Sequence, residues 1–158
     1  MKMNSDHSNL SVTLADPYSE ASSLLIHNLS QDLGQRYGDD GSGNFKPSDA
    51  QGPGGAFVIA WLDNQPAGCG ALRPLEPGIG EIKRMYVEPD FRRRGVARKI
   101  LEELEAVARE KNYRLLRLET GVLQPEAIGL YEVCGYRLIP CYSGYEVDSL
   151  SVWYEKEL

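Results

Sequence analysis

Residues 81–110 read EIKRMYVEPDFRRRGVARKILEELEAVARE, and this stretch predicts a strand, a basic turn and an amphipathic helix. The extended run from Ile82 to Val87 ends at Pro89, because proline donates no hydrogen bond to a ladder. From Gly95 onward, apolar residues recur at three- and four-residue steps, which places them on one helical face. They are Ala97, Ile100, Leu101, Leu104 and Ala108.

The start of this helix has the composition of an anion site. A helix start leaves backbone N–H groups without partners and carries a partial positive charge, and Ser, Thr, Asp or Asn usually satisfies those donors. Here the sequence is Arg92, Arg93, Arg94, Gly95, with no side-chain acceptor beside the donors. A phosphate would satisfy them. Taken alone, the turn is equally compatible with a solvated basic loop capped by Gly95.

The segment Arg92-Arg93-Arg94-Gly95-Val96-Ala97 resembles the Gln/Arg-x-x-Gly-x-Gly/Ala signature of the GCN5-related N-acetyltransferase (GNAT) family. The resemblance implies that backbone amides from Arg92 to Arg98 hold the pyrophosphate of acetyl-CoA. It further implies that backbone groups of Met85, Tyr86 and Val87 polarise the thioester carbonyl and pair with the pantetheine amides.

A second segment strengthens the resemblance. Residues 124–136, QPEAIGLYEVCGY, are similar to the family's Asn-x-x-Ala-x-x-Leu-Tyr-Glu-x-x-Gly-Phe pattern, with Gln124 replacing Asn and Tyr136 replacing Phe. Pro125 suits a first helical turn and Gly135 suits a helix end, so a short helix is expected here. The resemblance places Gln124, Ile128 and Tyr131 at the cofactor. Without the first motif, the same segment would predict only a packed helix with a core tyrosine.

The bulk composition limits the classes of function. The chain has 158 residues and a net charge of −6, which disfavours general binding to nucleic acid or to an anionic membrane and mildly favours cationic acceptors such as amines. Its three cysteines lack metal-site spacing and indicate reduced thiols, so no metal site and a cytoplasmic location are expected. No apolar run approaches membrane length.

The remaining chain predicts an α/β domain over residues 10–158 after a disordered tail over residues 1–9. Strand, helix and strand between residues 82 and 120 imply a parallel pair with a right-handed crossover. The resemblance implies a mixed, mostly antiparallel sheet flanked by helices, with that parallel pair splayed at the cofactor. The other expected strands cover residues 10–14, 56–62, 67–72, 137–140 and 150–155, and a first helix is expected from Asp16-Pro17 toward Leu33.

The acceptor side is less defined by the sequence. Residues 34–55 are rich in turn formers and predict a long loop that is either functional or mobile. Tyr37, Asp39 and Asp40 in or beside it are candidates to contact a substrate amine. Arg73 could anchor an acidic substrate group or lie on the surface. Tyr142 and Tyr145 could border the acceptor site or be surface aromatics.

The resemblance implies acetyl transfer from acetyl-CoA to an amine, here a small-molecule primary amine, by direct attack in a ternary complex. Tyr131 occupies the position of the family's general acid, which protonates the departing thiolate. Glu81 matches a position where relatives carry the base, and Glu119 is an alternative. A non-catalytic acyl-CoA-binding module on the same fold is the competing hypothesis. Relatives are often dimers, so a homodimer is compatible with the resemblance.

Overall fold

The computed structural model describes residues 9–142, 147 and 149–158. Seven strands form one sheet in the order β1-β2-β3-β4-β5-β7-β6. Their bounds are β1 Leu10–Leu14, β2 Ala56–Leu62, β3 Gln65–Glu76, β4 Ile79–Val87, β5 Leu115–Gly121, β6 Arg137–Ile139 and β7 Ser151–Glu157. The β4–β5 pair is parallel and every other neighbouring pair is antiparallel. The fold class predicted from the sequence is therefore confirmed.

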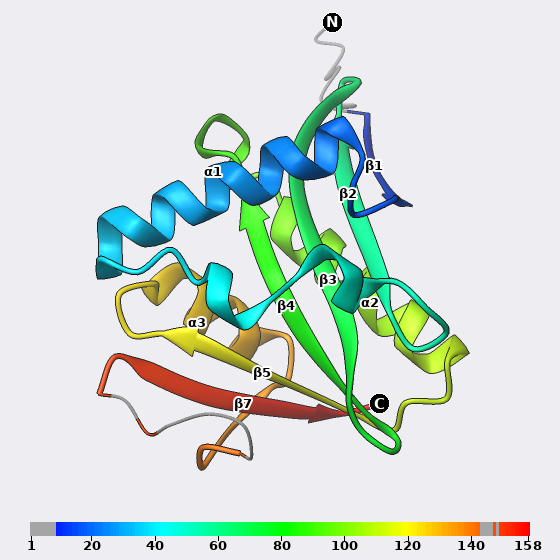
Figure 1. The fold of residues 1–158 in the computed structure, drawn as a ribbon, viewed down its shortest axis with the longest axis vertical. Coiled ribbons are helices and arrows are strands. Elements are labelled where there is room, and N and C mark those ends of the chain that lie inside the picture. The colour runs from blue at the N-terminus through cyan, green and yellow to red at the C-terminus, as the bar shows by residue number, and fades with distance from the viewer. Residues whose placement is uncertain (1–8, 143–146, 148) are drawn as a thin grey trace, which may run out of the picture.

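Helices cover both faces of the sheet (Figure 1). On one face lies α1 (Glu20–Tyr37), followed by the 3-10 turns η1 (Ser42–Asn44) and η2 (Pro47–Ala50). On the other lie α2 (Val96–Glu110) and α3 (Pro125–Val133). The apolar stripe predicted for α2 is buried, since Ile100, Leu101 and Leu104 are fully enclosed against the sheet. A second apolar cluster on the α1 face contains Leu25, Leu29 and Phe57.

The parallel pair separates part-way along its length. Pairing between β4 and β5 runs from Ile79–Leu115 to Ile82–Leu118, and both strands continue beyond it. On its other side β4 has a bulge, because it carries one residue more than β3 between the pairs Cys69–Tyr86 and Ala71–Lys83. Arg84 in this bulge has a φ of 57°, which is unusual for a residue other than glycine. The carboxyl half of β4 therefore presents a free edge toward β5.

The first helix differs from the prediction at both ends. It begins at Glu20, where the Ser19 hydroxyl accepts a hydrogen bond from Ser22 N at 3.2 Å. The predicted cap, Asp16, instead accepts from Tyr18 N at 2.9 Å, because a short carboxylate can close a turn two residues on as readily as it caps a helix. The helix continues to Tyr37 and ends at Gly38, whose φ is 75°.

The segment predicted as a long loop is more ordered than its composition indicated. Residues 34–37 belong to α1, and the 3-10 turns hold Phe45 and Ala50 in buried positions against the sheet. One buried aromatic ring is enough to fix a turn-rich segment, although such a segment has no apolar period for a sequence pattern to detect.

Residues 1–8 of the predicted tail and Tyr145 lie outside the described residues. Asn9, the last residue of that tail, donates from its N to Asp63 Oδ1, and Asp63 N donates to Asn9 O, both at 3.2 Å. In the part of the chain that the structure describes, no helix is both long and apolar enough to cross a membrane.

Candidate active site

A cleft of about 890 Å³ opens where β4 and β5 separate. Its walls come from the carboxyl halves of β4 and β5, the start of α2, the inner side of α3 and the carboxyl end of α1. The predicted cofactor residues in this lining are Met85, Tyr86, Val87, Arg92, Arg93, Gly95, Val96, Ala97, Arg98, Gln124 and Tyr131. Arg94 and Ile128 are not in the lining; Arg94 is exposed and Ile128 packs against the main core.

At one end of the cleft, helix α2 begins without a cap. Its N-cap residue is Gly95, with a φ of 77°, and no side chain among the described residues hydrogen-bonds to this helix start. The first-turn amides of Val96, Ala97 and Arg98 have no intrahelical partner by helix geometry. A Cβ added to Gly95 would meet no atom within 4 Å, and Gly95, Val96, Ala97 and Arg98 all line the cleft. This geometry suits a phosphate group.

The three arginines before Gly95 do not act alike. The Arg92 Nε donates to Val87 O at 3.0 Å, and its guanidinium lies 5.9 Å from the centre of the Tyr86 ring. Arg92 is therefore folded back on β4. Arg93 lines the cleft with a φ of 65°, while Arg94 is directed elsewhere on the exposed turn. The basic run thus supplies a local positive field rather than three equivalent ligands.

Tyr131 of α3 lines the cleft from the opposite wall. Only 5% of the residue is exposed, and its ring contacts Tyr136 edge-on with centroids 5.8 Å apart. Burial raises the pKa of its phenol well above the ordinary value of 10.0. Among the described residues no hydrogen-bond partner of the Tyr131 hydroxyl is found. The phenol is thus a neutral donor at physiological pH that has kept its hydrogen bond uncommitted.

The two candidate carboxylates are in different environments. Glu81 is fully buried, and its Oε1 accepts from Arg73 Nε at 2.8 Å while Oε2 accepts from the Tyr142 hydroxyl at 2.5 Å. Glu81 is not part of the cleft lining. Glu119 does line the cleft. Its Oε1 accepts from the Ser151 hydroxyl at 2.8 Å, and its Oε2 is buried with no partner. Glu119 is therefore the carboxylate with unused hydrogen-bonding capacity at the cleft.

Comparison with known proteins identifies the family. The model of the acetyltransferase (GNAT) family matches residues 23–136. An IAA acetyltransferase from Azospirillum brasilense is 33% identical over 151 residues, which cover 95% of this chain and 99% of that protein. The chain belongs to the GNAT family of acetyltransferases.

Solved structures agree with this assignment. A provisionally assigned acyl-CoA N-acyltransferase from Klebsiella pneumoniae superposes with a TM-score of 0.80 at 31% identity, covering 94% of this chain and 97% of that one. A GNAT acetyltransferase from Elizabethkingia anophelis, solved with acetyl-CoA bound, has a TM-score of 0.68 at 18% identity and covers 95% of this chain and 99% of that one. The second likeness is one of fold.

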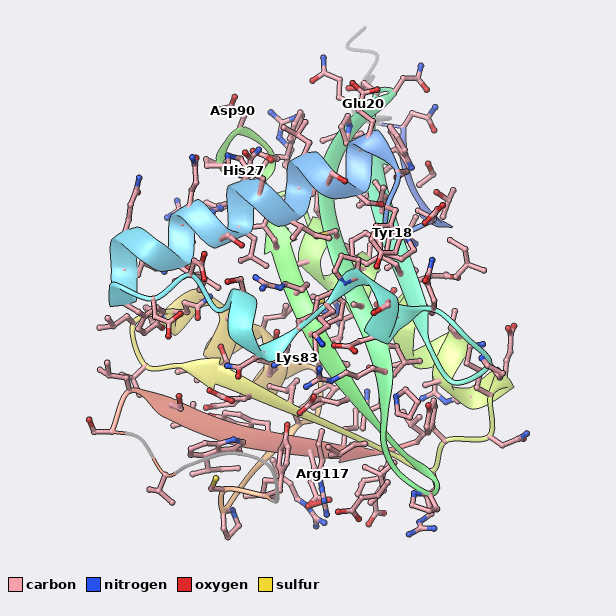
Figure 2. The ribbon with its side chains drawn as sticks, in the orientation of Figure 1. Tyr18, Glu20, His27, Lys83, Asp90 and Arg117 are labelled. Carbon is pink, nitrogen blue, oxygen red and sulfur yellow. The ribbon has the colours of Figure 1, made fainter. Side chains whose placement is uncertain are left out.

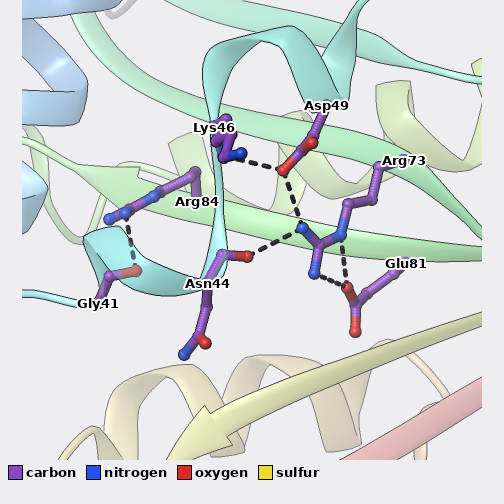
Figure 3. A network of polar contacts seen from close by, with 7 residues as sticks. All are labelled: Gly41, Asn44, Lys46, Asp49, Arg73, Glu81 and Arg84. Carbon is purple, nitrogen blue, oxygen red and sulfur yellow. Dashed lines mark hydrogen bonds and ion pairs between the residues drawn. The ribbon is translucent and has the colours of Figure 1, made fainter. Parts of the chain in front are cut away.

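The far end of the cleft in this N-acetyltransferase is lined by Asp39, which the sequence proposed as a substrate contact, and by four residues that the sequence left unassigned. Gly41 and Asn44 contribute from the segment after α1, and Lys83 and Arg84 contribute from β4 at its bulge. Arg84 donates from Nη2 to Gly41 O at 3.0 Å (Figure 3). Its Cζ also lies 5.8 Å from the centre of the Phe45 ring. The only sign in the sequence that both cations reach the cleft was that Lys83 and Arg84 are adjacent. In a strictly alternating strand, two adjacent side chains lie on opposite faces of the sheet.

Arg73, considered above as an anchor for an acidic substrate group, is bound to the protein's own acceptors. Its guanidinium joins Asn44 O at 2.9 Å, Asp49 Oδ2 at 3.0 Å and Glu81 Oε1 at 2.7 Å (Figure 3). The hypothesis of a substrate anchor is therefore replaced by a structural one: Arg73 ties the segment after α1 to the sheet. Asp40 likewise is not in the cleft lining.

The carboxyl end of α1 is tied to the loop between β5 and α3. The Tyr37 hydroxyl donates to Gln124 Oε1 and accepts from Leu123 N, both at 3.2 Å. Arg36 donates from Nη1 to Leu123 O at 2.9 Å and pairs with Glu126 at 2.8 Å. Tyr37, predicted as a substrate contact, lines the cleft and also orients Gln124.

Proposed function

We propose that this N-acetyltransferase moves the acetyl group of acetyl-CoA to a small-molecule primary amine by direct attack in a ternary complex. The observation that carries the proposal is the arrangement of one cleft: an uncapped helix start lies at one end, and Tyr131 and Glu119 face the same space. Membership of the family and a relative of the same fold with acetyl-CoA bound support the choice of cosubstrate.

The chain's residues fit the cosubstrate at two places. The amides of Val96, Ala97 and Arg98 would receive the pyrophosphate, with the charges of Arg93 and Arg98 nearby. Beyond Ile82, β4 has no pairing on its β5 side, so the main chain from Met85 to Val87 offers hydrogen-bonding groups to an extended amide-containing arm. The bound cosubstrate supplies an activated acetyl group as a thioester.

The reaction requires two proton transfers. A primary amine with a pKa near ~10.4 must lose a proton so that its nitrogen can attack the carbonyl carbon. As the new C–N bond forms and the C–S bond breaks, the thiolate takes a proton. Tyr131 is our candidate for the donor, because its hydroxyl is neutral and uncommitted.

Either Glu81 or Glu119 would accept the proton of the amine. Glu119 belongs to the cleft lining and its Oε2 has no partner, which favours direct transfer to that oxygen. Glu81 would need a relay, because Arg73 and Tyr142 occupy its oxygens. The two carboxylates are tested by comparing Glu119→Gln with Glu81→Gln. The variant that removes the base should lose the rise of kcat with pH, and the other variant should keep it.

The decisive experiment is thiol release from acetyl-CoA with a panel of primary amines, followed by mass detection of the acetylated product. Amine-dependent release, together with a rise in Tm on adding acetyl-CoA, is the expected result. Stabilisation by acetyl-CoA without turnover across the whole panel would instead favour the non-catalytic acyl-CoA-binding module. Absence of both would overturn the proposal and the cofactor assignment together.

A further inference from the structure

Three buried polar atoms without partners lie on a single face of the sheet beside the cleft. They are Arg117 Nε, Glu119 Oε2 and Trp153 Nε1, and they are the unpartnered buried side-chain atoms among the described residues. Glu119 and Trp153 lie directly opposite each other on β5 and β7, and Arg117 is two residues before Glu119 on the same face. Because folded proteins satisfy nearly all buried polar groups, three neighbouring exceptions indicate a place where another molecule supplies the partners.

Arg117 forms no ion pair among the described residues, although two buried carboxylates, Glu81 on β4 and Glu155 on β7, are its register partners. In the described part of the chain its guanidinium forms no salt bridge and no hydrogen bond, and its recorded contact is the Tyr142 ring, 5.6 Å from Cζ. Tyr142 is itself buried and held by Glu81 through its hydroxyl. Glu81 pairs with Arg73 and Glu155 pairs with Arg137, so an anion arriving with a ligand would stabilise the partly buried Arg117.

These atoms are continuous with the acceptor end of the cleft through Glu119. Glu119 and Ser151 belong both to the cleft lining and to this sheet face, and Lys83 adds a second cation from the β4 bulge. Figure 2 shows Lys83 lying between β4 and β5, and Arg117 beyond it toward β7. The face therefore carries one unpartnered acceptor oxygen and two unpartnered N–H donors, together with the cations Lys83 and Arg117 and the carboxylates Glu81 and Glu155.

We propose that the acceptor is an aminocarboxylate: its amine lies at Glu119 Oε2, and its carboxylate is bound by Arg117 and the Trp153 N–H. This rests on the proposed acetyl transfer and specifies its substrate class. Residues two apart on a strand are separated by roughly 7 Å, a span that one small molecule carrying both groups can cover through the long arginine side chain. Trp153 is 5% exposed, so its N–H is fixed in place before any ligand arrives.

The test compares each aminocarboxylate with the amine left after its carboxylate is removed: phenylalanine with phenethylamine, tryptophan with tryptamine, and lysine with cadaverine. For wild-type protein, kcat/KM should be at least about 10-fold higher for the carboxylate member of a preferred pair. Arg117→Gln should lower that value about 10- to 100-fold, the range for one charge-assisted hydrogen bond, and leave the decarboxylated amine within about 2-fold. Trp153→Phe, which keeps a ring and removes the N–H, should act in the same direction.

Arg109→Gln is the matched control, since Arg109 is an exposed arginine near the end of α2, which packs on the opposite face of the sheet. It should affect neither member of a pair. Binding without turnover is measured as the shift in Tm of the CoA-saturated protein when each of the same compounds is added. Stabilisation by a carboxylate member that is lost in Arg117→Gln supports the site. A wild-type preference for every decarboxylated amine, equal losses for both members in Arg117→Gln, or no stabilisation by any carboxylate member would overturn it.

The two proposals fail in different ways. If simple amines are acetylated and carboxylates give no advantage, the anion site is wrong and the acetyltransferase activity stands. If thiol release is absent with every compound but the carboxylate-dependent Tm shift is present, the binding site stands and the catalytic proposal is wrong.

Discussion

Arg73 and Glu81 lie directly opposite each other on β3 and β4 and form a buried ion pair in which Arg73 Nε and Nη2 both contact Glu81 Oε1, at 2.8 and 2.7 Å. The same arginine holds Asn44 and Asp49 of the segment after α1, and the second oxygen of Glu81 holds Tyr142. One carboxylate thus connects the segment after α1 with the loop that carries Tyr142.

Replacing Arg73 with Met should destabilise the protein by about 3–5 kcal/mol, because it leaves a fully buried carboxylate without its cation. Urea denaturation measures the loss. Arg137→Met provides the control: Arg137 is 67% exposed and its nearest carboxylate is 3.5 Å away, so a change of about 0–1 kcal/mol is expected. A loss in Arg73→Met no larger than in the control would show that the pair adds nothing to stability.

The second prediction concerns the helix start. Gly95→Val should abolish measurable acetyl-CoA binding, because a branched side chain would occupy the space in front of the α2 amides and cannot easily adopt a φ of 77°. Isothermal titration with acetyl-CoA reports it. Gly129→Ala makes a comparable change inside α3, where a Cβ meets nothing within 4 Å, and should leave binding intact while stabilising by about 0.5–1 kcal/mol. Undiminished affinity in Gly95→Val would exclude this turn as the phosphate site.

The third prediction separates chemistry from binding at α3. Tyr131→Phe removes a hydroxyl with no partner among the described residues, so stability should hardly change, while kcat should fall about 10²- to 10⁴-fold with KM for acetyl-CoA nearly constant. Tyr136→Phe is the paired control: its hydroxyl donates to Glu105 at 3.3 Å inside the core, so a change in stability and an unchanged kcat are expected. Unchanged turnover in Tyr131→Phe would remove the general-acid assignment.

The sequence predicted those elements of the fold well in which the apolar residues recur at a regular spacing. The helix from Val96 and the flanking strands were predictable, because the apolar period changes from two to nearly four across Gly95. The family assignment rested on fixed spacings at Gly95 and Tyr131, and the comparisons confirm it. These are local patterns, and local patterns are what a sequence displays directly.

The parts that could not be predicted depend on residues far apart in the chain. Arg73 meets Glu81, Asp49 and Asn44 only after β3, β4 and the segment after α1 have packed, so its pairing has no sequence signature. The β4 bulge changes which side chains face the cleft, and a strictly alternating strand gives no sign of it. The unpartnered atoms of Glu119 and Trp153 face each other only because β7 returns beside β5.

The last prediction concerns the stability of the protein at high pH. Burial raises the pKa of the Cys69 thiol from 9.0 to about 12, so the folded protein keeps a proton that the unfolded chain loses. The stabilisation is complete below about pH 9 and is lost as the pH rises toward 12, with a slope of up to about 1.4 kcal/mol per pH unit for one proton. Cys69→Ala should reduce that slope in the pH dependence of the unfolding free energy, whatever its effect on the absolute value.

Burial also raises the pKa of Tyr86 to about 12, so Tyr86 should contribute a second component of the same slope. Tyr86→Phe should remove that component. Identical slopes in wild type and Cys69→Ala would show that the thiol does not keep its proton in the folded state.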